Sequence, residues 1–279
     1  MDALTALRLQ IEWGANEALE AEPVDRLRPP SVRAAAVVSA STAPASGAPA
    51  SAASKSVAAG SAGRSAAMPQ AAGSRVAERA GHAAAAATTL DELRAAIAGF
   101  DGTTLRDTAT NMLFLEGDPA CGLLFVGEAP NADADRSGSS WAGAVGSYLE
   151  QMLRSIGLDR GALCLAPLIP WRPPGDRPPS PTEIATYLPF LHRMIALIAP
   201  RRIVVLGPLP ARALLGATPT RRRASPVWQH ATIPGIAASI PALTMPSPAI
   251  SLRVATQRRS AWADLRCLRH TLDSDLTQK

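Results

Sequence analysis

The chain has 279 residues, of which 47% are hydrophobic and 4% aromatic, and its formal net charge at pH 7 is +5. The apolar share is enough for a folded core, so the sequence excludes a wholly disordered chain. No apolar stretch is long enough to span a bilayer, so no membrane partner is predicted. The basic excess favours a polyanionic partner such as nucleic acid, although it also suits plain solubility.

The three cysteines are Cys121, Cys164 and Cys267. They are far apart in the sequence, odd in number and form no Cys-x-x-Cys pair, which favours small buried thiols over a disulfide framework or a zinc site. The first residues show no basic segment followed by an apolar one, so no secretory signal is predicted and a cytoplasmic location is expected.

Residues 1–87 divide into two predicted segments. Apolar residues recur with partial helical periodicity over 3–22, so residues 1–27 are expected to hold an amphipathic helix that docks on the domain or on a protein partner. Ala, Ser, Gly and Pro dominate residues 28–87, where little apolar surface is available to offset the entropy of ordering. This segment is predicted to be a disordered linker, with alanine runs capable of transient helix.

Residues 88–273 are predicted to form the folded domain, followed by a tail at 274–279. Thr89 and Glu92 have the spacing of a capping box, which predicts a helix ending near Gly102. Beyond it, strand and helix patterns alternate, which predicts an α/β fold: a three-layer α/β/α domain with a central, mostly parallel, four-stranded sheet. The predicted strands are 123–127, 163–169, 202–207 and 241–245, and the predicted helices are 143–156, 182–198, 208–215 and 256–271.

The most informative segment is the turn Gly127–Arg136, which follows the apolar run 123–126. Ligands of open α/β sheets bind beyond the carboxyl ends of such strands. A carboxylate at this point, Glu128, can orient a water or face the positive charge that builds up on a sugar carbon, but it can also simply cap the turn. Asp133 and Asp135 are interpreted as a solvated turn with a local pair to Arg136.

A second signal is the rigid, basic bend Trp171–Arg177. Its prolines hold an extended loop, and Gly175 permits the turn. Arg172 and Arg177 are spaced by this stiff segment, which favours contacts with phosphates over pairing with acids on the surface.

Together these motifs resemble the family 4 uracil-DNA glycosylases. The turn Gly127-Glu128-Ala129-Pro130 resembles their G-E-A-P-G, the bend resembles their C-R-P-P-G-N-R, and the segment 259–265 resembles their R-x-A-W-x-D-L helix. The resemblance covers roughly residues 100–270. It implies the fold, DNA as partner, a monomer, and hydrolysis of the bond between a flipped base, uracil, and its sugar.

The resemblance also implies roles for individual residues. Glu128 and Ser247 are the expected catalytic residues. The expected base pocket is formed by Gly127, Ala129, Pro130, Asn131, Trp141 and Pro167, and the expected contacts to the DNA backbone are Arg172, Arg177 and Arg253. Asn131 stands where relatives commonly have glycine, and it tolerates left-handed backbone angles. The glutamate turn, the proline bend and the Ser247 hairpin are expected to converge around one hollow the size of a nucleobase.

The chain departs from the family pattern at three kinds of position. Trp171 and Tyr187 replace cysteines of the iron–sulfur members, and no counterpart of the N-terminal cysteine pair is found, so no cofactor is expected and the [4Fe–4S] cluster is predicted absent. Pro167 replaces an asparagine that bonds the edge of uracil. Ser247 replaces the histidine of H-P-A-Y-L-L, and His230 is a candidate to approach the site in its place.

Three hypotheses stay open at this stage. The first is a DNA glycosylase whose activity is weak or altered. The second is a catalytically inactive homologue that binds DNA, or a repair partner through residues 3–22. The third is a site for a different base or nucleotide.

Overall fold

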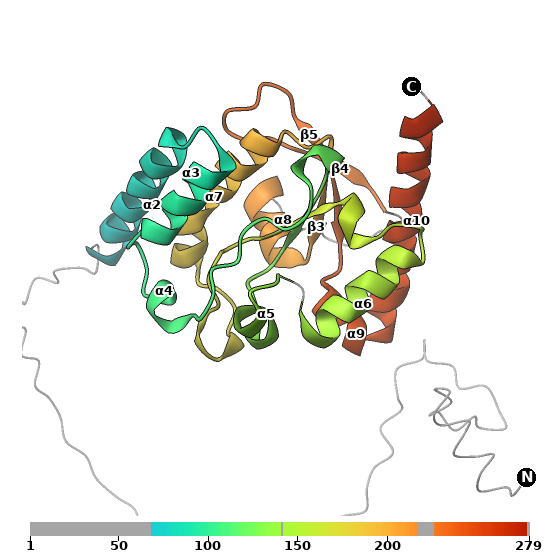
Figure 1. Cartoon of the computed structure of the whole chain (residues 1–279), viewed down its shortest axis with the longest axis horizontal. Coiled ribbons are helices and arrows are strands. Elements are labelled where there is room, and N and C mark those ends of the chain that lie inside the picture. Colours follow the sequence, from blue (N-terminus) through green and yellow to red (C-terminus); the bar gives the residue numbers. More distant parts are fainter. Residues whose placement is uncertain (1–67, 141, 217–225, 278–279) are drawn as a thin grey trace, which may run out of the picture. The chain divides into compact units, whose positions relative to one another are not determined.

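The computed structural model describes residues 68–140, 142–216 and 226–277, and this part of the chain forms a sheet covered by helices on both faces (Figure 1). The sheet order is β2-β1-β3-β5-β4. Its strands are β1 Leu123–Gly127, β2 Cys164–Pro167, β3 Arg202–Leu206, β4 Trp228–Ala231 and β5 Ile240–Met245. The first four in the order run parallel, and β4 is antiparallel to β5. The predicted α/β class and mostly parallel sheet are confirmed, but the sheet has one strand more than predicted, because β4 is a short edge strand without a β-branched run.

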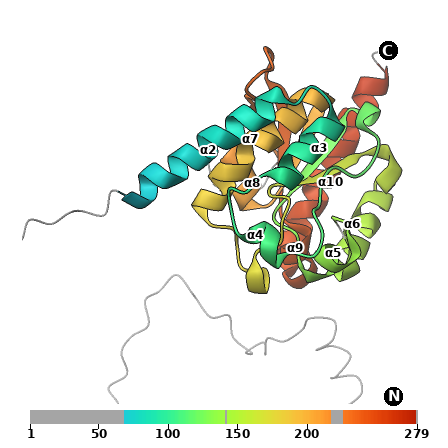
Figure 2. The ribbon, with the colours of Figure 1, turned by 60° about the vertical axis from the view of Figure 1, so that its left-hand side comes forward.

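Side chains of β1 and β3 alternate between two apolar layers, as the period of a strand requires. Leu124 and Ile203 face a layer covered by α2 Met68–Ala86, α3 Leu90–Gly99, α7 Pro181–Ile198 and α8 Pro208–Leu215. Phe125 and Val204 face the layer covered by α6 Gly143–Arg154 and α10 Ala255–Thr277. Figures 1 and 2 show α2 and α3 beside α7 on one side, with α6 and α10 on the other.

The helix α2 corrects the predicted linker, which was expected to run to residue 87. Ala80 and Ala84 are buried and Ala87 follows them into the core, so small side chains let this helix pack closely on α7. The carbonyl of Ala87 also accepts a hydrogen bond from Arg193 Nε at 2.7 Å. Alanine has the highest helix propensity, and packing against α7 makes the helix stable. The predicted amphipathic helix in residues 1–27 and the first part of the predicted linker, residues 28–67, lie outside the described residues. At the other end, α10 extends past the predicted domain end at 273.

The capping prediction at the next helix is confirmed. The Thr89 side chain accepts a hydrogen bond from the Glu92 N–H at 3.2 Å, and the Glu92 carboxylate accepts one from the Thr89 N–H at 3.3 Å. The remaining elements are short: α4 Leu105–Thr108, α5 Ala132–Ser137, α9 Pro248–Arg253, and the 3-10 turns η1 Pro119–Cys121, η2 Arg160–Ala162 and η3 Pro174–Asp176. In the described part of the chain, no helix combines the length and apolarity that crossing a membrane requires.

Two of the three cysteines, Cys121 and Cys164, are far apart in the sequence but close in space. Cys121 Sγ lies 3.8 Å from Cys164 Sγ, and all three cysteines are free thiols. Burial raises the pKa of the Cys164 thiol to about 12, so it is protonated at neutral pH.

Candidate active site

A cavity of about 90 Å³ lies at the carboxyl ends of the parallel strands. It sits where the chain order reverses between β1 and β3, which is the position at which open α/β sheets bind ligands. Its volume is far below the ~300–1,000 Å³ of pockets for drug-sized ligands, so it suits a single small ring. It is lined by Glu128, Ala129, Pro130, Asn131, Ser140, Val145, Pro167, Leu206, Ser247 and Ala249.

Glu128 is the acidic group of this cavity. It follows Gly127, the last residue of β1, and its side chain is half-buried. Burial raises the pKa of this carboxyl, while hydrogen bonds from the Leu209 N–H and the Ser247 hydroxyl oppose that rise. Leu209 lies in the first turn of α8, so the positive end of that helix faces the carboxylate. The arrangement holds a poorly solvated anion in one position.

Gly207 makes room for this carboxylate. It follows β3 and caps α8 with φ +99°, and a Cβ built there would lie 2.6 Å from Glu128 Oε1. Any side chain would therefore displace the acid as well as strain the backbone. Neither Gly207 nor Leu209 was among the predicted site residues. A glycine followed by proline marks the start of a helix in the sequence, but the approach to Glu128 exists only in space.

Ser247 lies where the cavity meets α9, and only 5% of its surface is exposed. The segment that follows it is a helix rather than the predicted hairpin, since Pro248 occupies the first helical position. The Ser247 hydroxyl donates to Glu128. A hydroxyl has one proton, so while Ser247 donates to Glu128 it cannot also donate to a departing base.

Asn131 and Ser140 bring further polar groups to the cavity wall. Asn131 has φ −95°, so it does not use the left-handed conformation considered for it, and its Oδ1 accepts the Ala134 N–H at 2.8 Å. This cap of α5 leaves its Nδ2 group as a donor. The Ser140 backbone N–H is tied to Glu116, while the Ser140 Oγ is buried and has no hydrogen-bond partner among the described residues. Ser140 was not predicted as a site residue.

Pro167 lies in the cavity wall, paired with Gly127 at the end of β2. Its ring provides neither a side-chain amide nor a backbone N–H at this point. A ligand in the cavity therefore receives no hydrogen bond from the strand position at which the family pattern has asparagine.

The proline bend contributes no described residue to the cavity wall, so only two of the three segments expected to converge do so. Its arginines pair with acids. Arg172 Nε lies 2.7 Å from Asp176 Oδ1, and Arg177 binds both carboxylate oxygens of Glu183, with N–O distances of 2.8 and 2.6 Å. The Arg177 pair lowers the pKa of Glu183 to about 2.

Asp135 differs from the predicted solvated acid. It is 3% exposed and accepts the backbone N–H groups of Thr110 and Asn111 at 2.8 and 3.0 Å. It therefore ties α5 to the preceding loop. The predicted pair between Asp133 and Arg136 is present, with an N–O distance of 3.2 Å.

Two other predicted residues, His230 and Arg253, do not line the cavity. His230 is on the edge strand β4, opposite Pro241 at the start of β5, whereas Ser247 follows the end of β5, so His230 is on the order of 15 Å away and does not replace the missing histidine. Arg253 is exposed in the last turn of α9. Trp141 lies outside the described residues.

The residues at the cluster positions of the family 4 pattern do not fit an iron–sulfur cluster. Trp171 and Tyr187 are buried, and Tyr187 packs against Phe190 with ring centroids 6.3 Å apart. Its hydroxyl lies 2.8 Å from the Thr103 hydroxyl. Such a cluster is held by cysteine thiolates. Within the described ranges, no group of three or more His, Cys, Asp or Glu side chains is placed to hold a metal.

Comparisons with known proteins identify the family. A model of the uracil DNA glycosylase superfamily matches residues 114–266. The type-4 uracil-DNA glycosylase of Pyrobaculum aerophilum is 35% identical over 126 residues, which cover 45% of this chain and 64% of the relative. The type-4 uracil-DNA glycosylase of Archaeoglobus fulgidus is 36% identical over 124 residues, which cover 44% of this chain and 62% of the relative. The type-4 uracil-DNA glycosylase of Sulfurisphaera tokodaii is 40% identical over 99 residues, which cover 35% of this chain and 45% of the relative.

The chain thus spans between about half and two thirds of the length of these relatives. The family match covers the strands, the glutamate turn and the Ser247 segment that surround the cavity. This chain belongs to the uracil-DNA glycosylase superfamily.

Proposed function

We propose that this chain is a DNA glycosylase that hydrolyses the bond between a flipped base, uracil, and its deoxyribose. The observation that carries the proposal is the half-buried Glu128 carboxylate, held by α8 and Ser247 in the wall of a cavity of about 90 Å³. The type-4 relatives are named for this activity on uracil-containing DNA.

In the proposed reaction, Glu128 acts on a water at the sugar. The carboxylate accepts a proton from the water, the water oxygen bonds to C1′, and the bond from C1′ to the base nitrogen breaks. The base leaves with the bonding electron pair and then takes up a proton. The same carboxylate stabilises the positive charge that develops on the sugar. The raised pKa of Glu128 makes it a stronger base than an exposed glutamate.

Asn131 and Ser140 are proposed to contact the base edge that Pro167 does not. The Asn131 Nδ2 group is fixed because its Oδ1 caps α5, and the Ser140 hydroxyl is buried without a partner. An unpartnered buried hydroxyl costs about 1–3 kcal/mol, which a bound base edge would recover. These two groups also supply hydrogen bonds to the negative charge of the departing base. The Ser247 hydroxyl does not fill this role while it donates to Glu128.

The helix α9 is proposed to hold the DNA beside the cavity. It presents the exposed apolar side chains Ile250 and Leu252, with Val254 just beyond its end, next to the cavity residues Ser247 and Ala249. Apolar side chains inserted between base steps stabilise a distorted duplex from which a base is extruded. Arg253, exposed on the same helix, is placed to contact a phosphate.

The test is base release from duplex and single-stranded DNA containing one uracil, with a panel of other lesions, followed by alkaline cleavage at the abasic site. We expect release by the wild type and a loss of about 10²–10⁴-fold in the Glu128→Gln variant. Glu150→Gln, a surface carboxylate of α6 paired with Arg160, is the matched control and should release base normally. No release by the wild type on any lesion, at enzyme excess, would refute the proposal.

A second candidate is a DNA-binding homologue without catalysis. Pro167 and the engagement of Ser247 with Glu128 favour it, since both remove hydrogen bonds from a bound base. It predicts salt-sensitive DNA binding that is unchanged in Glu128→Gln. The Ser247→His variant separates the two: if uracil release appears only with histidine, the wild-type site is inactive but otherwise intact.

A further inference from the structure

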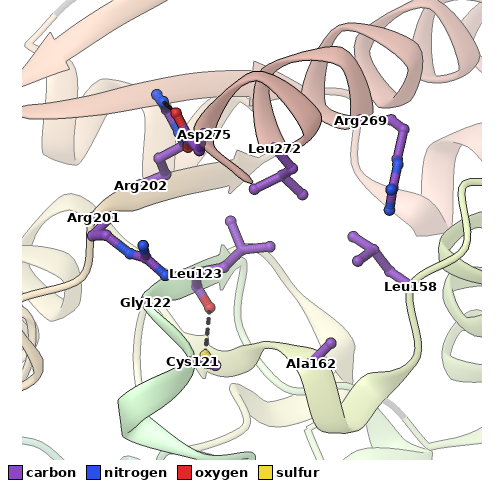
Figure 3. A pocket seen from close by; sticks show the side chains of 10 residues that line it. All are labelled: Cys121, Gly122, Leu123, Leu158, Ala162, Arg201, Arg202, Arg269, Leu272 and Asp275. Atoms are coloured by element: carbon purple, nitrogen blue, oxygen red, sulfur yellow. Dashed lines mark hydrogen bonds and ion pairs between the residues drawn. The ribbon is translucent and has the colours of Figure 1, made fainter. Parts of the chain in front are cut away.

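A second cavity, of about 200 Å³, lies at the opposite edge of the sheet from the candidate active site (Figure 3). It opens where β1 and β3 begin, so the length of β1, about 15 Å, separates the two cavities. Its walls come from the turn before β1, the start of β3, η2 and the end of α10. The lining residues are Cys121, Gly122, Leu123, Leu158, Ala162, Arg201, Arg202, Arg269, Leu272 and Asp275.

The floor of this cavity is apolar. Leu123, Leu158 and Leu272 line it, together with the small side chain of Ala162 (Figure 3). The volume is below the ~300 Å³ at which pockets for drug-sized ligands begin. The floor therefore suits a compact apolar group such as one aliphatic or aromatic side chain.

Two of the three arginines around this floor are already paired. Arg202 binds both oxygens of Asp275, with N–O distances of 2.8 and 2.5 Å, and stacks 5.1 Å from the centre of the Trp228 ring. Arg269 binds both oxygens of Asp273. These pairs fix the rim of the cavity and leave little of either charge for a ligand.

Arg201 is the third arginine of this cavity, and neither of those two ion pairs includes it. Its backbone N–H bonds the Gly122 carbonyl at 2.8 Å, and its side chain crosses Gly122 toward Leu123 (Figure 3). A Cβ at Gly122 would lie 2.8 Å from Arg201 Nε, so this glycine permits the side chain to lie across the cavity mouth. No carboxylate among the described residues accepts a hydrogen bond from the Arg201 guanidinium, and both oxygens of the nearby Asp275 are engaged by Arg202.

We propose that this cavity binds a carboxylate attached to a compact apolar group, with Arg201 holding the carboxylate and the leucine floor holding the apolar group. A guanidinium matches the two oxygens of a carboxylate, and an apolar floor beside it selects acids with a hydrophobic body. The ligand is either a free small acid or the C-terminal residue of another chain. The proposal does not depend on glycosylase activity.

The test is calorimetric titration of the full chain with N-acetylphenylalanine, with a hexapeptide ending in phenylalanine, and with the C-terminal amide of that peptide. We expect at least one carboxylate to bind, and the amide to bind tenfold or more weakly. Arg201→Gln should weaken binding at least tenfold, and Ala162→Phe, which fills the space beside the floor, should abolish it. Arg154→Gln removes an exposed arginine of α6 that does not line the cavity, and it should change nothing.

A second readout works on the wild type alone. Cys121 lines the cavity, so a saturating carboxylate should slow its alkylation, while Cys267, on α10 and outside the lining, should react at an unchanged rate. Equal affinity for both carboxylates identifies a small acid as the ligand, and preference for the peptide identifies a chain terminus. No binding of either at millimolar concentration, or binding that survives both Arg201→Gln and Ala162→Phe, overturns the proposal.

Discussion

Replacing Glu128 by glutamine should lower activity and raise stability. Burial raises the pKa of this carboxyl above its ordinary value of 4.5, so folding favours the protonated form. The stability that the group contributes is present below pH 4.5 and is lost as the pH rises through the raised pKa. At neutral pH the carboxylate therefore destabilises the fold. Glutamine is uncharged, has nearly the same shape, and can still accept the Leu209 and Ser247 hydrogen bonds.

The magnitude follows from the desolvation penalty of a buried polar group, about 1–3 kcal/mol, offset in part by the two hydrogen bonds. We expect Glu128→Gln to gain about 1 kcal/mol at pH 7, or ~2–4 °C in Tm for a domain of this size. Thermal melts of wild type and variant at pH 7 and pH 4 measure it, with Glu150→Gln as control. A gain that is absent at pH 7, or one that is as large at pH 4 as at pH 7, would refute the assignment of Glu128 as a desolvated anion.

The remaining predictions concern other parts of the domain. Gly207→Ala should reduce base release far more than Gly216→Ala, because both have positive φ but only the first would push its Cβ into the Glu128 carboxylate; equal losses would contradict this. Tyr187→Phe should cost about 1 kcal/mol in urea unfolding, since it removes the Thr103 hydrogen bond, and an unchanged midpoint would count against that bond. Arg253→Gln should weaken DNA binding and reduce the slope of log K against log salt by about 0.9, and an unaltered slope would exclude a phosphate contact.

Most of the fold could be predicted because the buried strands and their helices have strong local patterns. The β3 run Arg202–Leu206 and the capping box at Thr89 are examples in which propensity, burial and capping agree. The two misses have one cause. The α2 helix is stabilised by packing against α7, and the β4 strand by pairing with β5. Neither segment has a sequence pattern that by itself predicts a packed helix or a strand.

The candidate site was predictable only at the level of segments. The motif placed Glu128, Pro167 and Ser247 together, and the cavity contains all three. It did not predict that Ser247 would donate to Glu128, because that bond depends on how α9 approaches the end of β1. It also favoured phosphate contacts over pairing with acids for the arginines of the proline bend, and in the structure Asp176 and Glu183 bind them.

These departures share a physical consequence for the chemistry. The histidine and asparagine of the family pattern would each supply a donor to the base, whereas Pro167 has none and the one hydroxyl proton of Ser247 is shared with Glu128. Two other polar groups of the same cavity, Asn131 Nδ2 and Ser140 Oγ, belong to the segment after β1 and could donate in their place. A base held by these two groups would be contacted from a different segment than one held from β2. Selectivity among bases in this chain should therefore respond to substitution of Ser140 and Asn131 more than to the restoration of asparagine at residue 167.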